Sequence, residues 1–305
     1  MKGSTFHQLV VFRTIVEEGS IRGAARKLEV APPSASHALK QLEAHIGLPL
    51  FTRSTRRIEL TEAGKLLHEQ VSGAISTLDF ALESVQDLNT SPSGKVSITL
   101  PRFAFDFFLR PIYAEFCARY PDIQLEISVS DKSVDIISEG HDMGIRFGDR
   151  IDPGMVARQL TAPMREALFV SESYIERYGV PKTPDDLKDH KLIQYRYIAS
   201  NQLAPLLLQS QGQAASVQMP LALIVNDTDV MVDAARKGLG IGRIVTPLVA
   251  EDFKRGSLTP VLEANWYPYP SLFVYFMQNS QKARRVRVLI DFLVEKGAAL
   301  FSTIP

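Results

Sequence analysis

Cysteine is almost absent from this sequence, since Cys117 is the single one in 305 residues. One cysteine can form neither an internal disulfide nor a cysteine metal cluster, and such sparse usage is typical of a reducing compartment. Long apolar runs are absent too, because none approaches the roughly 18–20 residues that a membrane-spanning helix requires. The apolar N-terminal stretch is interrupted by Arg13 and Glu17, and no small-residue cleavage site follows it. We therefore expect a cytoplasmic protein with no membrane partner.

Catalytic and cofactor-binding patterns are also missing. The six histidines show no metal-ligand spacing, and neither a serine elbow nor a phosphate-binding loop occurs. Gly238, Gly240 and Gly242 follow a predicted helix rather than opening one, so they do not form a dinucleotide-binding fingerprint. We therefore predict that the protein is not an enzyme and that it uses no metal and no cofactor.

Charge is balanced over the whole chain but unevenly distributed along it. The formal net charge is zero, yet residues 1–60 carry nine Lys/Arg against five Asp/Glu. This head is therefore +4, and residues 61–305 are −4. A basic head on a mildly acidic body is the asymmetry expected when only the head meets a polyanion.

The head has the pattern of three short helices. Apolar spacing predicts a first helix over residues 5–18, and Ser20 can cap a short second helix. A third helix is predicted over residues 32–46. Its core-facing residues are Ala35, Leu39, Leu42 and Ile46. Its opposite stripe is small, polar or basic and consists of Pro33, Ser36, His37 and Lys40. Short polar side chains near a helix N-terminus can reach base edges, and Lys40 can contact a phosphate.

A basic hairpin follows the third helix. Residues 50–53 and 58–60 are predicted as short strands around a turn, and three arginines lie within five residues. Such a wing suits phosphate contact or minor-groove insertion. Helix, turn, helix and basic hairpin in this order favour DNA binding. The predicted DNA-contacting residues are Ser20, Arg22, Pro32, Pro33, Ser36, His37, Lys40, Arg53, Arg56 and Arg57.

Residues 6–64 resemble the N-terminal domain of the LysR-type transcriptional regulators. The matching stretches are EEGSIRGAARKLEVAPPSASHALKQLE and IGLPLFTRSTRRIELTEAG. The resemblance implies a winged helix-turn-helix whose third helix lies in the major groove of DNA. The positions that it places against bases are Pro32, Pro33, Ser36 and His37. The chain departs from the family pattern at Ala31, where a capping serine is usual, and at His37, where Arg, Lys or Gln is common.

A long helix is predicted from Thr61, which can cap it, to about Leu88. Its apolar residues recur every three or four positions, at Leu67, Val71, Ile75, Leu78, Leu82, Val85 and Leu88. Such a stripe predicts packing against a partner helix, with an ordinary helix lying on its own domain as the alternative. The LysR resemblance favours the partner helix, because this helix is the dimerisation element of the family. It implies a homodimer, and a homotetramer as the further assembly.

From Lys95 onward, predicted strands alternate with helices, which argues for parallel-rich sheets covered by helices. The predicted strands are 96–100, 123–129, 143–147, 156–160, 167–170, 221–225, 241–245 and 272–277. The LysR resemblance extends more weakly along this body. It implies two Rossmann-like subdomains of the periplasmic-binding-protein type, joined by crossing strands near residues 161 and 267. The predicted fold class is α/β, with an N-terminal winged helix-turn-helix, a long linker helix and two Rossmann-like regulatory subdomains.

The domain boundaries follow from these patterns, with the turn formers of residues 89–94 marking the main break. The predicted domains are a DNA-binding domain (1–60), a linker helix (61–89) and an effector-binding domain (94–305). Within the last, subdomain I comprises about 94–161 and 267–305, and subdomain II about 162–266.

Ligands of such folds bind between the lobes, outside the carboxyl ends of the strands. Arg102, Arg146 and Arg243 follow or lie near such strand ends, and together they can hold a carboxylate. The resulting hypothesis is an anionic effector. The alternative for Arg146, and more so for Arg243, is a structural ion pair, with Asp142 or Asp149 as candidate partners of Arg146.

Aromatic residues near these strand ends are candidate walls of the same site and extend the hypothesis to an aromatic effector. These are Phe103, Phe105 and Tyr197. The predicted effector-binding residues are Pro101, Arg102, Phe103, Asp131, Arg146, Phe147, Gly148, Tyr197, Asn226, Asp227 and Arg243.

The leading interpretation is a DNA-binding transcriptional regulator controlled by a small-molecule effector. Double-stranded DNA and the effector are its expected partners, and RNA polymerase is a further candidate. A two-lobed solute-binding protein and an enzyme on a two-lobed fold are the alternatives. The absent export signal counts against the first, and the absent acid–base or nucleophile set counts against the second. The sequence leaves open the effector, the operator, activation or repression, and dimer or tetramer.

Overall fold

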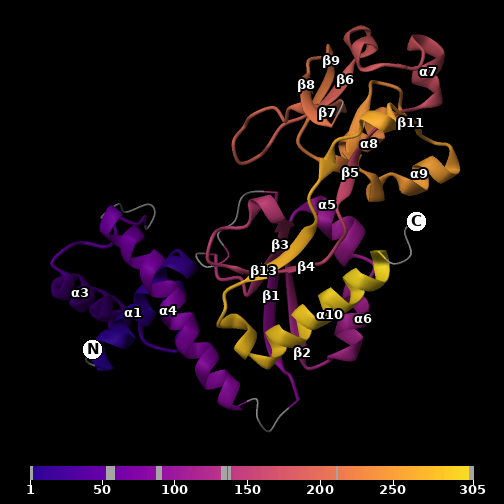
Figure 1. Ribbon diagram of the computed structural model, residues 1–305. Helices are drawn as coiled ribbons and strands as arrows, with labels where there is room; N and C mark the ends of the chain where they lie inside the picture. The colour runs from indigo at the N-terminus through magenta and orange to yellow at the C-terminus, as the bar shows by residue number, and fades with distance from the viewer. Residues whose placement is uncertain are drawn as a thin grey trace.

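The structure is a computed structural model that describes residues 3–52, 59–86, 91–131, 136, 139–210 and 212–301. It consists of a helical head, one long helix and a two-lobed α/β body (Figure 1). The head and the body have separate hydrophobic cores. No helix among the described residues combines the length and the apolar character needed to cross a membrane.

The head is built from three helices, α1 (Gly3–Glu18), α2 (Ile21–Lys27) and α3 (Pro32–Ile46). Ala24 and Ala25 on α2 are buried, and their small side chains allow the close helix crossing that a helix-turn-helix requires. The buried face of α3 contains Ala35, Ala38, Leu39 and Leu42. Our expectation for Ile46 was wrong, since it is 37% exposed in the last turn, beyond the end of the buried face at Leu42.

Helix α4 (Glu62–Gln86) begins tightly against the end of the head. The Thr61 hydroxyl accepts a hydrogen bond from the Gly64 amide (3.1 Å) and donates one to the Pro49 carbonyl (2.7 Å). Gly64 packs so closely that an added Cβ would lie 2.1 Å from the Leu50 carbonyl oxygen. The first turn of α4 is thereby fixed to the chain segment that leads into the wing.

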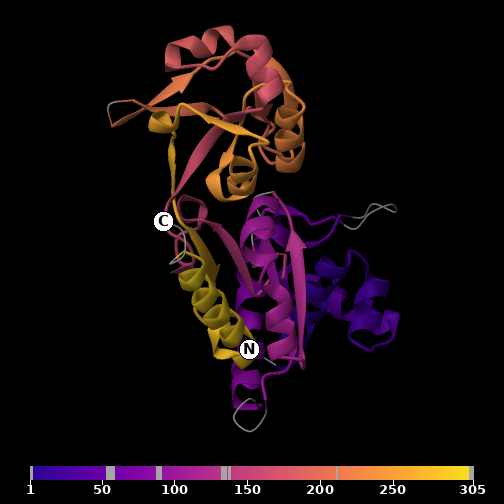
Figure 2. The same cartoon turned by 90° about the vertical axis from the view of Figure 1, so that its right-hand side faces the viewer.

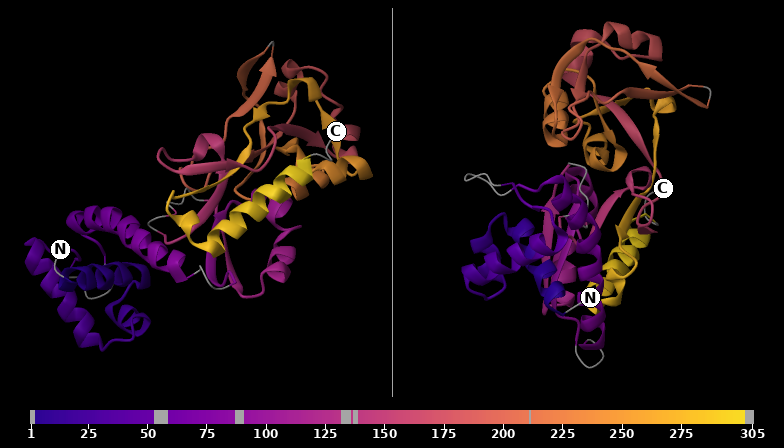
Figure 3. Two further views of the ribbon diagram at one scale, coloured as in Figure 1. Left: turned by 60° about the horizontal axis from the view of Figure 1, so that its bottom comes forward. Right: turned by 90° about the vertical axis from the view of Figure 1, so that its left-hand side faces the viewer.

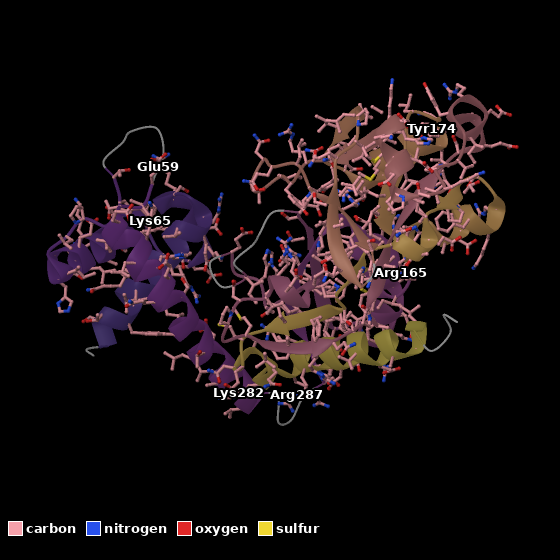
Figure 4. All side chains as sticks on the ribbon, turned by 45° about the horizontal axis from the view of Figure 1, so that its top comes forward. Glu59, Lys65, Arg165, Tyr174, Lys282 and Arg287 are labelled. Carbon is pink, nitrogen blue, oxygen red and sulfur yellow. The ribbon has the colours of Figure 1, made fainter. Side chains whose placement is uncertain are left out.

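Farther along, α4 leads from the head to the body (Figure 3). Asp79 pairs with Arg13 of α1 (3.5 Å), and the Thr77 hydroxyl accepts a hydrogen bond from Asn279 of the body (3.3 Å). Lys282 and Arg287 mark this junction at the lower edge of the molecule in Figure 4. Both head and body thus contact the same helix, which can pass a displacement from one to the other.

The first lobe has a five-stranded sheet in the order β2-β1-β3-β13-β4. These strands are β1 (Gly94–Leu100), β2 (Ile123–Val129), β3 (Met143–Phe147), β4 (Val156–Gln159) and β13 (Leu272–Phe276). β1 pairs in parallel with β2 and β3, whereas β13 is antiparallel to β3 and β4. The sheet is therefore mixed, because β13 returns from the other lobe in the opposite direction. Its long C-terminal helix is α10 (Arg284–Phe301).

The helix predicted after β1 is interrupted. It consists of α5 (Arg102–Ala104), a π-helical turn, η1 (Phe105–Leu109), and α6 (Tyr113–Arg119). Pro111 lies at the break, where its missing N–H and its ring prevent a regular helix from continuing. The wide π turn begins directly beside the strand ends that the sequence singled out.

The second lobe is built around β5 (Met164–Val170), which is antiparallel to β10 (Gly242–Val245) and β11 (Thr259–Val261). β6 (Leu192–Tyr195) pairs in parallel with β9 (Leu221–Val225), and β7 (Leu206–Ser210) forms a hairpin with β8 (Gln213–Val217). Its helices are α7 (Glu172–Tyr178), α8 (Thr228–Arg236) and α9 (Ala250–Arg255). We did not expect strands at β6, β7, β8 or β11 from the sequence.

Two chain segments connect the lobes, as Figure 2 shows. One leads from β4 into β5, and the other from β12 (Pro268–Tyr269) into β13. The Leu160 amide donates to the Leu272 carbonyl (2.8 Å), and the Leu272 amide donates to the Thr161 hydroxyl (2.9 Å). These hydrogen bonds hold the two connections side by side, so together they form one hinge.

Candidate DNA-binding surface and effector cleft

The face of α3 opposite the head core is open to solvent. Pro33, His37 and Lys40 are exposed and Ser36 is half-buried. Pro32 at the start of the helix is exposed as well. The same helix therefore has an apolar face that fixes it to α1 and α2 and a polar face of the size that enters a major groove.

The other predicted DNA contacts lie around this helix. Ser20 caps α2 by accepting a hydrogen bond from the Gly23 amide (3.0 Å), and Arg22 is exposed in the first turn of that helix. The wing arginines Arg53, Arg56 and Arg57 lie outside the described residues. The base of the wing is formed by an antiparallel bridge between Phe51 and Leu60.

Helix α3 lacks the side-chain cap that α2 has. Ala31 occupies the N-cap with extended backbone angles, and Pro32 and Pro33 follow it. The Ser34 amide is the first N–H of this helix, and it donates only to the Ala31 carbonyl (2.9 Å).

We expect Ala31→Ser to raise the free energy of unfolding of the head by about 1 kcal/mol, because a serine hydroxyl can accept a hydrogen bond from the Ser34 amide. Ala44→Ser places the same side chain at an exposed position late in α3, where we expect a decrease of about 0.5 kcal/mol or less. Urea unfolding followed by helical circular dichroism measures both variants. Equal effects at the two positions would contradict the capping argument.

A cleft of about 300 Å³ opens between the two lobes. Four residues of the predicted effector site line it: Arg102, Asp131, Asn226 and Asp227. Val129, Ser130 and Ile198 complete the lining. The first lobe contributes the ends of β1 and β2, and the second contributes the end of β9, as expected for strands whose carboxyl ends face a ligand.

Burial raises the pKa of the Asp131 carboxyl, and the nearby Asp227 carboxylate raises it further. Hydrogen bonding from the Arg102 amide and the charge of Arg146 oppose this shift. Asp131 is therefore a carboxylate whose negative charge is only partly compensated by its surroundings.

Arg146 lies next to this cleft rather than in an ion pair with Asp142 or Asp149. Its guanidinium donates to the carbonyl oxygens of Ile145 (2.9 Å) and Ser130 (3.2 Å), and burial lowers its pKa. Asp142 instead accepts hydrogen bonds from the amide and hydroxyl of Ser97. Arg146 thus fixes the Ser130 carbonyl that borders the cleft.

An aromatic cluster lies beside the cleft. Phe147 stacks on Phe103 (ring centroids 5.0 Å apart) and contacts Tyr269 of the hinge (5.3 Å). Gly148, which follows Phe147, leaves room for the ring of Phe273, and Pro101 is buried before α5. Phe147 therefore joins the first lobe to the hinge more than it forms a ligand wall.

The structure does not bring Arg243 together with Arg102 and Arg146. Arg243 is 4% exposed, and its guanidinium bonds to Glu166 (3.3 Å) and to the carbonyl oxygens of Ala204 and Pro205 (2.8 and 2.7 Å). Both terminal nitrogens of its guanidinium donate to buried partners of the second lobe, so our expectation of a three-arginine carboxylate site is corrected. A sequence register could not show this, because Glu166 is 77 residues away along the chain.

Glu166 connects this ion pair to the hinge. The Tyr269 hydroxyl donates to its other carboxylate oxygen (3.4 Å), and burial raises the pKa of both groups above their ordinary values. Arg165, the neighbouring residue on β5, places its guanidinium 5.7 Å from the centroid of the Trp266 ring. The side chains of Arg165 and Glu166, which are neighbours on β5, are thus both held by contacts.

The second lobe also contributes Tyr195, which sequence reasoning missed. Tyr195 pairs with Val225 at the end of β9, two residues before Asp227, and its pKa is raised to about 12 by burial and by the charges of Asp131 and Asp227. Tyr197, a predicted wall, contacts Tyr195 edge to face at 5.9 Å. The signal that could have revealed Tyr195 is its place at the end of β6, a strand that the sequence analysis did not recognise.

Comparisons with known proteins agree with this architecture. Residues 6–65 match the family model described as bacterial regulatory helix-turn-helix protein, lysR family, and residues 89–298 match the LysR substrate binding domain. The chain is 29% identical to the HTH-type transcriptional regulator PgrR of Escherichia coli over 98% of this chain and 100% of that protein. It is 31% identical to an HTH-type transcriptional regulator of Xanthomonas campestris, covering 94% and 84%. The structure of CrgA, a LysR-type transcriptional regulator from Neisseria meningitidis, is similar with a TM-score of 0.61, 26% identity and coverage of 95% and 98%.

Proposed function

Because the chain belongs to the LysR family of DNA-binding transcriptional regulators, a non-enzymatic family with an effector-binding domain, we propose how its parts divide this work. Residues 1–60 bind DNA in the cytoplasm, residues 61–89 link and dimerise, and residues 94–305 bind the effector. Closure of the lobes on an effector changes the contacts of α4, and α4 changes the placement of two paired heads. The observation that carries the DNA-binding part is the two-faced character of α3, buried on one side and polar and exposed on the other.

Different residues of the proposed DNA-contacting set bind the bases and the phosphates. Pro32, Pro33, Ser36 and His37 stand at the base-reading end of α3, and Lys40 stands at the phosphate. Ser20 and Arg22 support the approach to the DNA backbone, and Arg53, Arg56 and Arg57 contact phosphates or the minor groove. Arginine and lysine contacts to phosphate release counterions, so binding weakens steeply as salt increases.

Lys40→Ala tests the phosphate contact. We expect weaker binding to every DNA sequence and a decrease of about 0.9 in the slope of log K against log salt for each protomer that loses one contact. Fluorescence anisotropy with the DNA upstream of the protein's own gene, over about 50–200 mM salt, measures both values. Lys254→Ala is the matched control, because Lys254 is exposed on α9 of the second lobe. An unchanged salt slope for Lys40→Ala would place this lysine off the DNA.

The proposed assembly is a homodimer that pairs into a homotetramer. Two separate apolar surfaces support it. On α4, Leu78, Leu82 and Val85 are exposed at spacing i, i+4, i+7, and Leu82 is 69% exposed. On the second lobe, Leu221 and Ile224 are exposed on β9, whose described partner is β6. Two distinct self-associating surfaces on one chain build a closed assembly larger than a dimer. RNA polymerase is a further proposed partner of the DNA-bound assembly.

Leu82→Glu tests the α4 surface. A charge in the middle of a helix–helix seam opposes pairing, so we expect the mass in solution to fall by one assembly step at micromolar concentration. Light scattering after size-exclusion chromatography measures the mass, and Glu69→Ala on an exposed part of the same helix serves as the control. A mass unchanged in Leu82→Glu would place the seam elsewhere.

The proposed effector is a small anionic metabolite held in the cleft by Arg102. Among the described residues the Arg102 guanidinium has no ion-pair partner, whereas both terminal nitrogens of Arg243 bond to buried partners of the second lobe, so Arg102 is the cation available to a ligand carboxylate. A cleft of about 300 Å³ lies at the small end of ligand sites, which suits a metabolite of few heavy atoms. The test is protection of the upstream DNA with and without candidate carboxylates, in wild type and in Arg102→Gln.

A further inference from the structure

The effector cleft is lined by acidic as well as basic side chains. Arg102 is accompanied in the lining by two carboxylates, Asp131 from the first lobe and Asp227 from the second. A ligand that offered only negative charge would meet one arginine and two aspartates at close range. Like charges in a partly dry site repel, so an anionic metabolite that also carries a cationic group matches this lining better than one with a carboxylate alone.

Both aspartates also cap helices, but this role uses one oxygen of each. Oδ1 of Asp131 accepts a hydrogen bond from the Arg102 amide (3.0 Å). Oδ1 of Asp227 accepts from the amides of Asp229 (2.9 Å) and Val230 (3.1 Å). The hydrogen bonds found within the described part of the chain leave Oδ2 of each aspartate for another donor. Oδ2 of Asp131 and Oδ2 of Asp227 belong to opposite lobes, so one cation between them would draw the lobes together.

The aromatic surroundings favour a cation at the same place. Tyr195 pairs with Val225, two residues before Asp227, and Tyr197 contacts the Tyr195 ring edge to face. The faces of tyrosine rings attract ammonium groups, most strongly where water is excluded. Tyr195 is half-buried, and burial raises the pKa of Asp131 even though the charges of Arg146 and Arg102 oppose this shift, so a further positive charge beside Asp131 would be favourable.

We infer that the effector is a small zwitterion of the amino-acid type, whose carboxylate binds Arg102 and whose ammonium group lies between Asp131 and Asp227 beside Tyr195. This inference rests on the proposed function, since it specifies the ligand of the same cleft. The ammonium group bridges the lobes, and Val129 and Ile198 accept the apolar part of the ligand. Effector binding thereby closes the hinge through opposite charges on both lobes.

The experiment compares ligands that differ by one charged group. The full-length protein is titrated by calorimetry, and its melting temperature is recorded, with the proteinogenic amino acids and with two analogues of each apolar one. For leucine these are 4-methylpentanoate, which lacks the amine, and 3-methylbutylamine, which lacks the carboxylate. We expect at least one amino acid to bind about tenfold or more tightly than either of its analogues, because each charge-assisted contact contributes on this scale.

The variants Asp131→Asn and Asp227→Asn keep a cap acceptor and remove a charge. We expect each variant to bind the zwitterion about tenfold more weakly. The affinity for the amine-free analogue should be unchanged or higher. Asp229→Asn is the matched control, because Asp229 is exposed two residues farther along α8 and is absent from the cleft lining. The melting temperatures of the unliganded variants are measured in the same series, so a loss of binding caused by misfolding is recognised.

The inference is overturned if the amine-free carboxylate binds as tightly as the amino acid, or if none of the amino acids binds at about 10 mM, far above the usual affinity of a metabolite site. Either result leaves the proposed function intact as long as the same preparation binds its upstream DNA in a salt-dependent manner. Loss of that DNA binding would overturn the proposed function instead, so the two failures are distinguishable.

Discussion

Replacing Arg243 by methionine is expected to lower the free energy of unfolding of the second lobe by about 3–5 kcal/mol. The guanidinium is the countercharge of the buried Glu166 carboxylate and the donor to the carbonyl oxygens of Ala204 and Pro205. Methionine fills a similar volume but leaves all three acceptors without that partner, and an unpaired buried carboxylate is the most expensive of them. Trp266, the single tryptophan, is buried in the same lobe and reports its unfolding by fluorescence.

The pH dependence of this variant has a definite sign. Burial already raises the pKa of Glu166 in the wild type, and Arg243 opposes that shift, so its removal raises the pKa further. A folded-state pKa above the unfolded value near 4.5 means that the folded protein binds more protons between the two values. The contribution of Glu166 to the free energy of unfolding is then fully present below pH 4.5 and is lost as pH rises through the folded-state pKa. We expect Arg243→Met to recover part of its deficit between neutral pH and about pH 5.

Two further variants complete the argument for Arg243. Arg255→Met makes the same substitution at an exposed arginine of α9, where we expect a change within about 0.5 kcal/mol. Arg243→Met combined with Glu166→Gln removes both charges, and we expect it to be more stable than Arg243→Met alone. If Arg243→Met unfolded like the wild type at neutral pH, the ion pair would not hold the lobe, and Arg243 would again be available to a ligand.

Replacing Gly64 by alanine is expected to destabilise the head by about 3 kcal/mol and to abolish DNA binding at moderate salt. The new methyl carbon would lie 2.1 Å from the Leu50 carbonyl oxygen and 2.9 Å from a methyl carbon of Leu60. The first contact is with backbone, which cannot rotate away, so the start of α4 must move from the chain segment that leads into the wing. The higher helix propensity of alanine recovers only about 1 kcal/mol.

This effect should be confined to the head. The Trp266 fluorescence transition should remain at the wild-type urea concentration, because Trp266 belongs to the body core and not to the head core. Loss of head structure is measured by circular dichroism and by anisotropy with labelled upstream DNA. Glu69→Ala, at an exposed site of the same helix, should bind DNA as the wild type does. Full DNA affinity in Gly64→Ala would show that the close contact with Leu50 does not position the head.

Local rules predicted the local features of this fold. Ser20 caps α2 and Thr61 caps α4, and Gly47 ends α3 with a φ of +81°, a backbone conformation that glycine adopts without strain. These features depend on residues within a few positions of one another, so a sequence contains them directly. The alternation of strands and the position of α3 were predicted for the same reason, and the family resemblance supplied the two-lobed arrangement.

Contacts between distant segments could not be predicted in this way. The partner of Arg243 is Glu166 on another strand, and nothing in the spacing of either residue indicates the pair. Tyr195 escaped attention because β6 is only four residues long and has no clear alternation. Pro111 was present in the sequence, but its effect on the helix after β1 was not anticipated. Arg102, Asp131, Asn226 and Asp227 could be singled out from the sequence because each follows the carboxyl end of a predicted strand, and they remain candidates for effector binding.

Nuclease footprinting of the DNA upstream of the protein's own gene, with and without an amino acid that binds the cleft, tests the central claim most directly. The account predicts protection of two half-sites a whole number of helical turns apart, about 10 base pairs or a multiple, because paired heads read the same face of the duplex. The amino acid should shift the protected region in the wild type and leave it unchanged in Arg102→Gln. Absence of any protection, even at about 50 mM salt where phosphate contacts are strongest, would contradict the account.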